Sequence, residues 1–321
     1  MNQPDPMEFL AVLMNRAQTL EIIGRTQAKA KRGAHLRPWA MGVGRNLVDA
    51  NSSLGRDDAE FMADYTGDMV SATAVYPIMN AIDSITAIAE LIDGRTKSGD
   101  SHASSLLTLC RMATESAATT IWLLSNTDRD MRRGLSVRFT ASELNAQRGY
   151  QSSTRKYFEH GSLGKRSVEY QQFLEHVRLF DERVVMLERG MQETPNAKVK
   201  GSGDVVIAAA KWLDGHPPLH DGDAGPYGRP FGFEDVAKSF YNVSSAIVHG
   251  LKWPLDYMPS GEVDLSRMIV EGVNNAVSMA ECAVALFEAQ AQSWETETDR
   301  PILYPDSLQP TIEDWADLYP V

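Results

Sequence analysis

Three polar side chains with chemical potential recur every four residues in the segment 233–251. Tyr241, Ser245 and His249 would therefore share one face of a helix. Hydroxyl groups donate and accept hydrogen bonds, and imidazole titrates near neutral pH. Gly250 can end the helix, so the dipole would favour protonated His249 in the last turn. The stripe suits general acid–base chemistry; a histidine that only satisfies backbone carbonyls is the alternative. The opposite, apolar seam comprises Val236, Phe240, Val243 and Ile247.

A second candidate lies in the segment 101–124, which we expect Ser101 to cap. Arg111 and Glu115 stand four residues apart and would pair on one helix face. Trp122 shares that face, while the opposite face is apolar, so the helix should be buried on both sides. A structural ion pair and a functional one both fit this pattern.

These two polar faces are expected to meet. A buried polar group without a partner costs roughly 1–3 kcal/mol. We therefore predict a polar centre in which Glu115 accepts a hydrogen bond from His249, Ser245 or a nearby arginine.

Metal-binding residue types also occur in the span 216–223, which contains His216 and His220. The two prolines between them forbid a helix, so no regular spacing presents both imidazoles together, and a flexible polar loop is expected.

Cys110 and Cys282 lie in apolar helical patterns and should be buried in a reducing compartment. Glycine-rich phosphate-binding, zinc-protease and serine-hydrolase motifs are missing from the sequence. We expect no metal and no cofactor.

Composition and charge narrow the class of protein. The chain has 321 residues, 43% of them hydrophobic, and a net charge of -12, which indicates a globular protein without general affinity for nucleic acids. The charge is uneven, because residues 256–321 hold 13 acidic and two basic residues whereas residues 129–166 hold nine basic and three acidic ones. The segment 129–166, with Arg132 and Arg133, is therefore the better candidate for an anionic partner.

Helical periodicity dominates the long segments, so the sequence predicts an all-α, multi-helix bundle. We expect an N-terminal helix and basic loop over residues 1–65, a bundle core over 66–298 and an extended, proline-rich acidic tail over 299–321. Gly24 should end the first helix, and Asp93 with Gly94 should close a later one. The other expected helices cover about 69–92, 101–124, 128–160, 165–189, 205–213, 233–251 and 264–294.

The sequence offers no sign of export or membrane insertion. The N-terminus lacks a basic region followed by an apolar run, so it is not a secretion signal. The most apolar run, 205–213, is too short to span a bilayer. We expect a cytoplasmic protein without a membrane partner.

Two short segments carry a family resemblance. They read RMATESAA at 111–118 followed by WLL at 122–124, and FYNVSSAIVHG at 240–250 followed by Trp253, with Arg132 and Arg133 between them. Together they resemble an uncharacterised actinobacterial family of all-helical proteins that looks like a distant member of the HEPN-like superfamily. The resemblance spans roughly residues 70–290.

This resemblance implies a HEPN-like helical core, often paired as a homodimer. Some members are metal-independent RNases, toxins or defence effectors, and others are inactive binding modules. The nuclease members place an arginine four to six residues before a histidine, where this chain has Val243, Ser244 and Ser245. The motif therefore departs from the usual form.

Two functions remain open at this point. The first is a protein that binds a protein or RNA partner in stress response or phage defence. The second is an RNase in which His249 is the general acid or base and an arginine from another helix stabilises the phosphorane. The candidate arginines are Arg111, Arg132 and Arg133.

Overall fold

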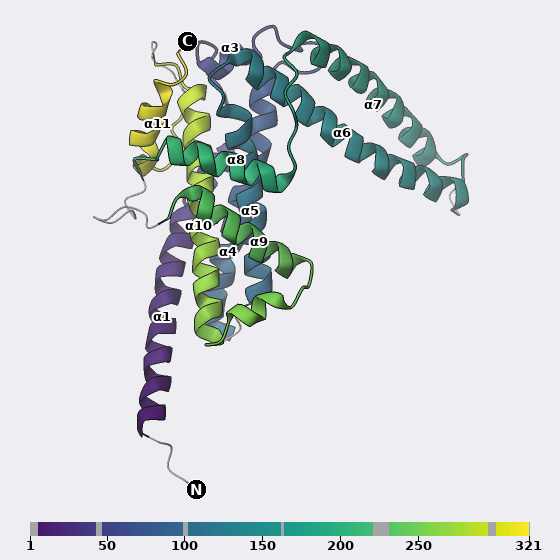
Figure 1. Ribbon diagram of the computed structural model, residues 1–321. Helices are drawn as coiled ribbons and strands as arrows, with labels where there is room; N and C mark the ends of the chain where they lie inside the picture. Colours follow the sequence, from purple (N-terminus) through teal and green to yellow (C-terminus); the bar gives the residue numbers. More distant parts are fainter. Residues whose placement is uncertain are drawn as a thin grey trace.

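All regular elements in the described part of the chain are helices, which confirms the predicted all-α bundle (Figure 1). The computed structural model describes residues 6–42, 47–98, 102–161, 164–220, 231–294 and 300–320. The bundle consists of long helices with shorter ones laid across them (Figure 1).

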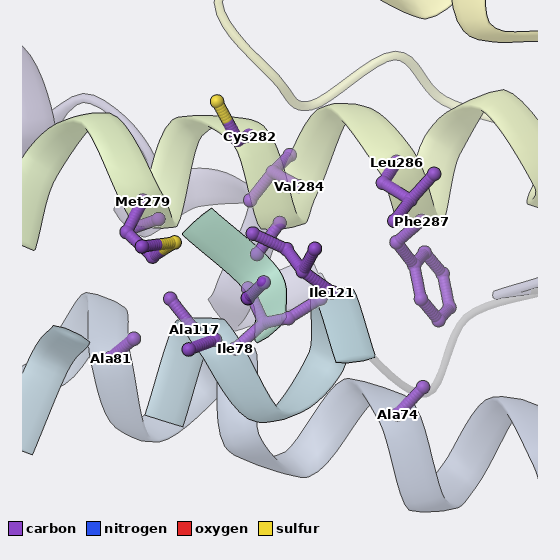
Figure 2. Close-up of a cluster of buried hydrophobic side chains, with 14 of the residues drawn as sticks. Ala74, Ile78, Ala81, Ala117, Ile121, Met279, Cys282, Val284, Leu286 and Phe287 are labelled. Carbon is purple, nitrogen blue, oxygen red and sulfur yellow. The ribbon is translucent and has the colours of Figure 1, made fainter. Parts of the chain in front are cut away.

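Three helices form the centre of the bundle. They are α4 (Met69–Ser98), α5 (Ala103–Leu124) and α10 (Glu262–Ala291), and α1 (Pro6–Ala34) packs on α10 and α4. Figure 2 shows how Ile78 of α4, Ile121 of α5 and Phe287 of α10 fill the space between them. Because α5 also contacts α8 and α9, it is buried on both faces, as its pattern predicted.

The remaining helices cover this centre or extend from it. Helices α8 (Ser202–Gly215) and α9 (Phe233–Val248) cross α5, while α6 (Arg129–His160) and α7 (Val168–Glu193) form a long hairpin that projects from the bundle (Figure 1). Helix α6 begins directly after its N-cap residue Asp128, close to the start expected from the sequence. Short elements complete the fold: α2 (Arg37–Gly42), α3 (Ser53–Asp58), α11 (Gln309–Ala316) and the 3-10 turns Trp253–Tyr257 and Asp306–Leu308.

The first helix is much longer than predicted. It passes through Gly24 to Ala34, and α2 begins at Arg37, so most of the expected basic loop is helical. A glycine inside a helix costs only about 1 kcal/mol, which burial of the following turns offsets. Thr26 and Ala30 are buried in those turns. At Gly33, an added Cβ would lie 2.7 Å from side-chain atoms of α4 and α10, so the backbone approaches them closely.

The remaining predictions about helix ends and buried residues have separate outcomes. Helix α4 continues through Asp93 and Gly94 to Ser98, so the predicted end there is wrong. Ser101, the expected cap of α5, lies outside the described residues, as do residues 221–230 of the long loop before α9. Cys110 and Cys282 are both buried, as predicted.

The C-terminal tail is not an extended strap. Residues 309–316 form α11, and Trp315 and Tyr319 are buried against the bundle. Pro310 stands in the first turn of α11, where its missing N–H has no helical partner to lose. The tail therefore belongs to the packed core, and the expected boundary at residue 299 does not separate it.

One described helix has the length and apolar character of a membrane span. It is the part of α4 between Met69 and Arg95. Helices α1, α5, α6 and α10 all pack against α4, and central helices of soluble proteins have the same composition. The fold is therefore compatible with a soluble protein.

Asp58 joins α3 to the start of α4. Its carboxylate accepts hydrogen bonds from the backbone N–H of Val70 at 2.7 Å and of Ser71 at 3.3 Å, and from the Ser71 hydroxyl at 2.5 Å. These bonds satisfy N–H groups that the first turn of a helix leaves free. Burial outweighs these bonds and raises the pKa of Asp58 to about 6.

This pKa predicts a pH-dependent stability. The folded protein binds the Asp58 proton more tightly than the unfolded chain, so the free energy of unfolding should fall as pH rises from about 4 to about 7, by roughly 3 kcal/mol. Urea denaturation across this range should show the decline in the wild type but not in Asp58→Asn. The exposed Asp64→Asn serves as control. Parallel pH profiles for wild type and Asp58→Asn would contradict the assignment.

Candidate functional site

The predicted polar centre exists in part. The Arg111 Nε donates to Glu115 Oε1 at 2.6 Å, and its Nη2 donates to the Tyr241 hydroxyl at 3.3 Å. The guanidinium carbon also lies 4.7 Å from the centroid of the Tyr241 ring, a cation–π geometry. The polar faces of α5 and α9 therefore meet, and an arginine is the partner of Glu115.

His249 does not belong to this centre. It is the C-cap residue of α9, its side chain is exposed, and its backbone N–H bonds to the Ser245 carbonyl at 3.1 Å. In the described part of the chain, no hydrogen bond or ion pair joins His249 to Glu115. Of the donors expected for Glu115, the nearby arginine is therefore the one observed and His249 is not, because α9 is rotated from the expected seam. Its buried side chains are Phe233, Ala237, Phe240, Ser244 and Ala246.

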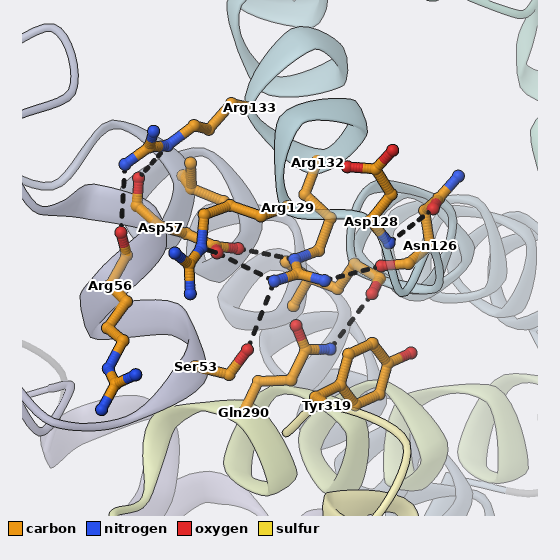
Figure 3. A network of polar contacts seen from close by, with 12 residues as sticks. Ser53, Arg56, Asp57, Asn126, Asp128, Arg129, Arg132, Arg133, Gln290 and Tyr319 are labelled. Carbon is orange, nitrogen blue, oxygen red and sulfur yellow. Dashed lines mark hydrogen bonds and ion pairs between the residues drawn. The ribbon is translucent and has the colours of Figure 1, made fainter. Parts of the chain in front are cut away.

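Arg132 lies in a buried ion-pair network (Figure 3). Its guanidinium forms a bidentate ion pair with the wholly buried Asp57: Nε donates to Oδ2 at 2.5 Å and Nη2 donates to Oδ1 at 2.8 Å. Nη1 donates to the carbonyls of Asn126 and Thr127, and Arg129 adds a third contact to Asp57 at 3.1 Å. Arg132 is 2% exposed, so the network fixes α3 against the start of α6.

Arg133 has a structural role as well. Its Nε donates to the Asp57 carbonyl at 2.7 Å, and its Nη2 to the carbonyls of Arg56 and Ala59 at 3.0 and 3.1 Å. Carbonyls at the end of a helix lack intrahelical partners, and Arg133 satisfies them for α3. The first arginines of α6 are thus held by contacts within the fold.

The two histidines of the segment 216–223 also have separate surroundings. The His216 ring stacks on Trp212 with centroids 4.5 Å apart. The His220 side chain is buried, and its Nδ1 lies 2.8 Å from the Thr311 hydroxyl. A group of three or more His, Cys, Asp or Glu that could hold a metal does not occur in the residues that the structure describes.

A wide groove is a further candidate site, which the sequence did not predict. It has a volume of about 1140 Å³ and runs between the end of α5, the start of α6, the segment 196–201 and α8. Trp122, Leu135 and Ala197 are buried apolar side chains that contribute to its floor.

Charged side chains stand on the edges of this groove. Lys198, Lys200 and Lys211 are exposed, and none of them has an ion-pair partner in the described part of the chain. Asp204 and Glu234 line it too, so the charged lining amounts to three positive and two negative groups on a molecule of net charge -12. The groove is thus a locally positive place on an acidic protein.

The sequence contained one sign of this groove. Lys198 and Lys200 alternate in a short segment that leads through Gly201 to α8. Alternating lysines outside a helix point to the same side of an extended chain. The groove as a whole could not have been inferred, because its lining comes from three separate parts of the sequence, 122–135, 196–212 and 234.

Comparisons with known proteins give no information about this site. The chain matches none of the known protein families, none of the curated proteins and none of the solved structures to which it was compared.

The Arg111–Glu115 pair predicts a specific loss of stability. Glu115→Ala would leave the Arg111 guanidinium, which is only 15% exposed, without its carboxylate. We expect the free energy of unfolding to fall by about 2 kcal/mol. Urea denaturation should show little change for the exposed Glu188→Ala. Equal stabilities of the two variants would contradict the structural role of Glu115.

Breaking the Asp57–Arg132 pair should lower the free energy of unfolding more than breaking the Arg111–Glu115 pair does. Asp57→Ala leaves a buried guanidinium uncompensated, and we expect a loss of about 3–5 kcal/mol. The double variant Asp57→Leu/Arg132→Met removes both charges and should recover much of that loss, measured by the same denaturation. The single variants Asp57→Leu and Arg132→Met complete the comparison. A double variant that loses as much stability as these two single variants lose together would show that the two charges are not coupled.

Proposed function

We propose that this protein works by binding, and that the groove between α5, α6 and α8 receives an acidic segment of a partner protein that also carries apolar side chains. The observation behind the proposal is a set of three lysines that have no ion-pair partner among the described residues and lie beside a floor of Trp122 and other apolar side chains. Recognition would combine burial of an apolar anchor with charge pairing at the edges.

The size of the groove favours a chain over a small molecule. Ligand pockets usually hold about 300–1,000 Å³ and enclose most of the ligand. This groove, at about 1140 Å³, is larger, and the segments 122–135, 196–212 and 234 all contribute to its lining. A peptide segment would fit such a surface.

Charge selects the kind of segment. A net charge of -12 repels acidic partners from most of the surface. The groove, which has more lysines than acidic residues, is therefore a site at which an acidic partner could bind. Asp204 and Glu234 would repel carboxylates and so help to fix the register of the bound segment.

The RNase alternative has less support. It requires His249 and an arginine at one phosphate, whereas Arg111, Arg132 and Arg133 are each held by contacts within the fold. We expect purified wild type and His249→Ala to leave a mixed RNA pool equally intact. Cleavage by the wild type that is lost in His249→Ala would restore the nuclease hypothesis.

The biological setting stays a prediction. Membership of the HEPN-like superfamily, a role in stress response or phage defence and a cytoplasmic location all rest on the sequence. Cys110 and Cys282 are buried thiols that form no disulfide in the described part of the chain, which is consistent with a reducing compartment.

The groove proposal is tested with a labelled peptide. A fluorescein-tagged peptide of alternating Glu and Leu with one Trp should bind the wild type in fluorescence anisotropy, and the same peptide with Lys in place of Glu should not. Replacing the three groove lysines with Glu should weaken binding at least tenfold, equivalent to about 1.4 kcal/mol. The substitutions are Lys198→Glu, Lys200→Glu and Lys211→Glu.

A matched control separates the groove from bulk charge. Lys156→Glu, Lys238→Glu and Lys252→Glu alter the net charge equally at exposed positions that do not line the groove. This triple variant should bind the acidic peptide nearly as the wild type does, apart from weak long-range repulsion. Equal losses in both triple variants, or stronger binding of an RNA oligonucleotide to the groove, would refute the proposed partner.

A further inference from the structure

The first half of α1 extends beyond the bundle (Figure 1). Among the side chains whose burial the structure describes, Thr19, at 7% exposed, is the first buried one. Before it, Met7, Leu10, Leu13 and Met14 are 71%, 50%, 47% and 65% exposed. A lone helix of this length is marginal in water, since most helical stability comes from packing of an apolar face. The projecting segment therefore presents an apolar surface that requires a partner.

The chain's own bundle cannot cover this surface. At 100° per residue, Met7, Leu10, Met14 and Ala17 form one stripe along α1. Thr19, Thr26 and Ala30, which are buried, lie on the opposite side of the helix. The stripe therefore faces away from the bundle, and its partner must be another molecule.

The spacing of the stripe suits a second copy of the same helix. Positions 7, 10, 14 and 17 follow the three-four-three spacing of paired helices. They are symmetric about position 12, so an antiparallel copy brings Leu10 level with Met14 and Met7 level with Ala17. Each apolar residue then faces an apolar residue across a two-fold axis, which is the self-complementarity that a symmetric dimer needs.

Charge favours the same occupant. Two copies of a chain with net charge -12 repel each other, but residues 6–20 contain one acidic and one basic residue, Glu8 and Arg16. The interface segment is thus neutral overall. An antiparallel pair also keeps the two acidic bundles at opposite ends of the paired helices, whereas a parallel pair would place them side by side.

We propose that α1 pairs in antiparallel orientation with α1 of a second copy through this stripe, so that the protein is a homodimer with its two bundles at opposite ends of the paired helices. The inference is independent of the groove, whose lining residues begin at Trp122.

Sedimentation equilibrium of the full-length chain tests the interface. The wild type should be a dimer at micromolar concentration, and Leu10→Asp/Met14→Asp should raise the dissociation constant at least a hundredfold. The control Leu255→Asp/Ile302→Asp places the same charges at apolar residues that are 67% and 66% exposed elsewhere, and it should stay dimeric. A wild-type monomer at every concentration, or a dimer that survives Leu10→Asp/Met14→Asp, would overturn the proposal.

Disulfide trapping tests the orientation. A mixture of the Leu10→Cys and Met14→Cys proteins should form a disulfide-linked heterodimer on mild oxidation, and each protein alone should link much less; the native cysteines are buried and do not compete. Links formed only within the Leu10→Cys protein and within the Met14→Cys protein would indicate a parallel pair and refute the proposed orientation. A monomer that binds phosphatidylglycerol vesicles through the stripe would replace the second copy with a lipid surface.

Discussion

The fold depends on the burial of α10 from all sides. From Val273 to Ala291 nearly every residue of this helix is buried, including residues that in a surface helix would face water. Removing so much apolar surface from water provides a large driving force, but only when other helices surround the whole circumference. Helices α1, α4, α5 and α11 provide that cover. The two ends of the chain are therefore drawn to the same central helix.

Buried polar groups on α10 determine where the ends attach. Glu281 receives two hydrogen bonds from Arg32 of α1, at 2.6 and 2.8 Å. Glu288 accepts from the Trp39 indole N–H at 2.6 Å and from both Nη atoms of Arg300, at 2.5 and 2.8 Å. A buried carboxylate without such partners would be costly, so these contacts select one arrangement of the terminal segments.

Local patterns revealed the helices but not their ends or their partners. Apolar periodicity located α5 and α6 within a few residues, because the pattern is a property of each segment alone. The predicted breaks at Gly24 and Gly94 failed because packing outweighs a modest local preference. The contact of Arg111 with Tyr241 followed from facing polar stripes, whereas the position of His249 depended on the rotation of α9. The groove arises only when distant segments come together, which no single segment encodes.

The α6–α7 hairpin gives the groove a mechanical property. The helices leave the bundle through Met131 and Leu135, and the chain returns through Asn196 and Lys198, all of which line the groove. The residues at which the hairpin leaves and rejoins the bundle, which we call its roots, thus line one site. The rest of the hairpin projects from the bundle (Figure 1). A change in the angle at which the hairpin leaves the bundle would therefore also change the width of the groove, and a bound segment that touched both roots would oppose that change.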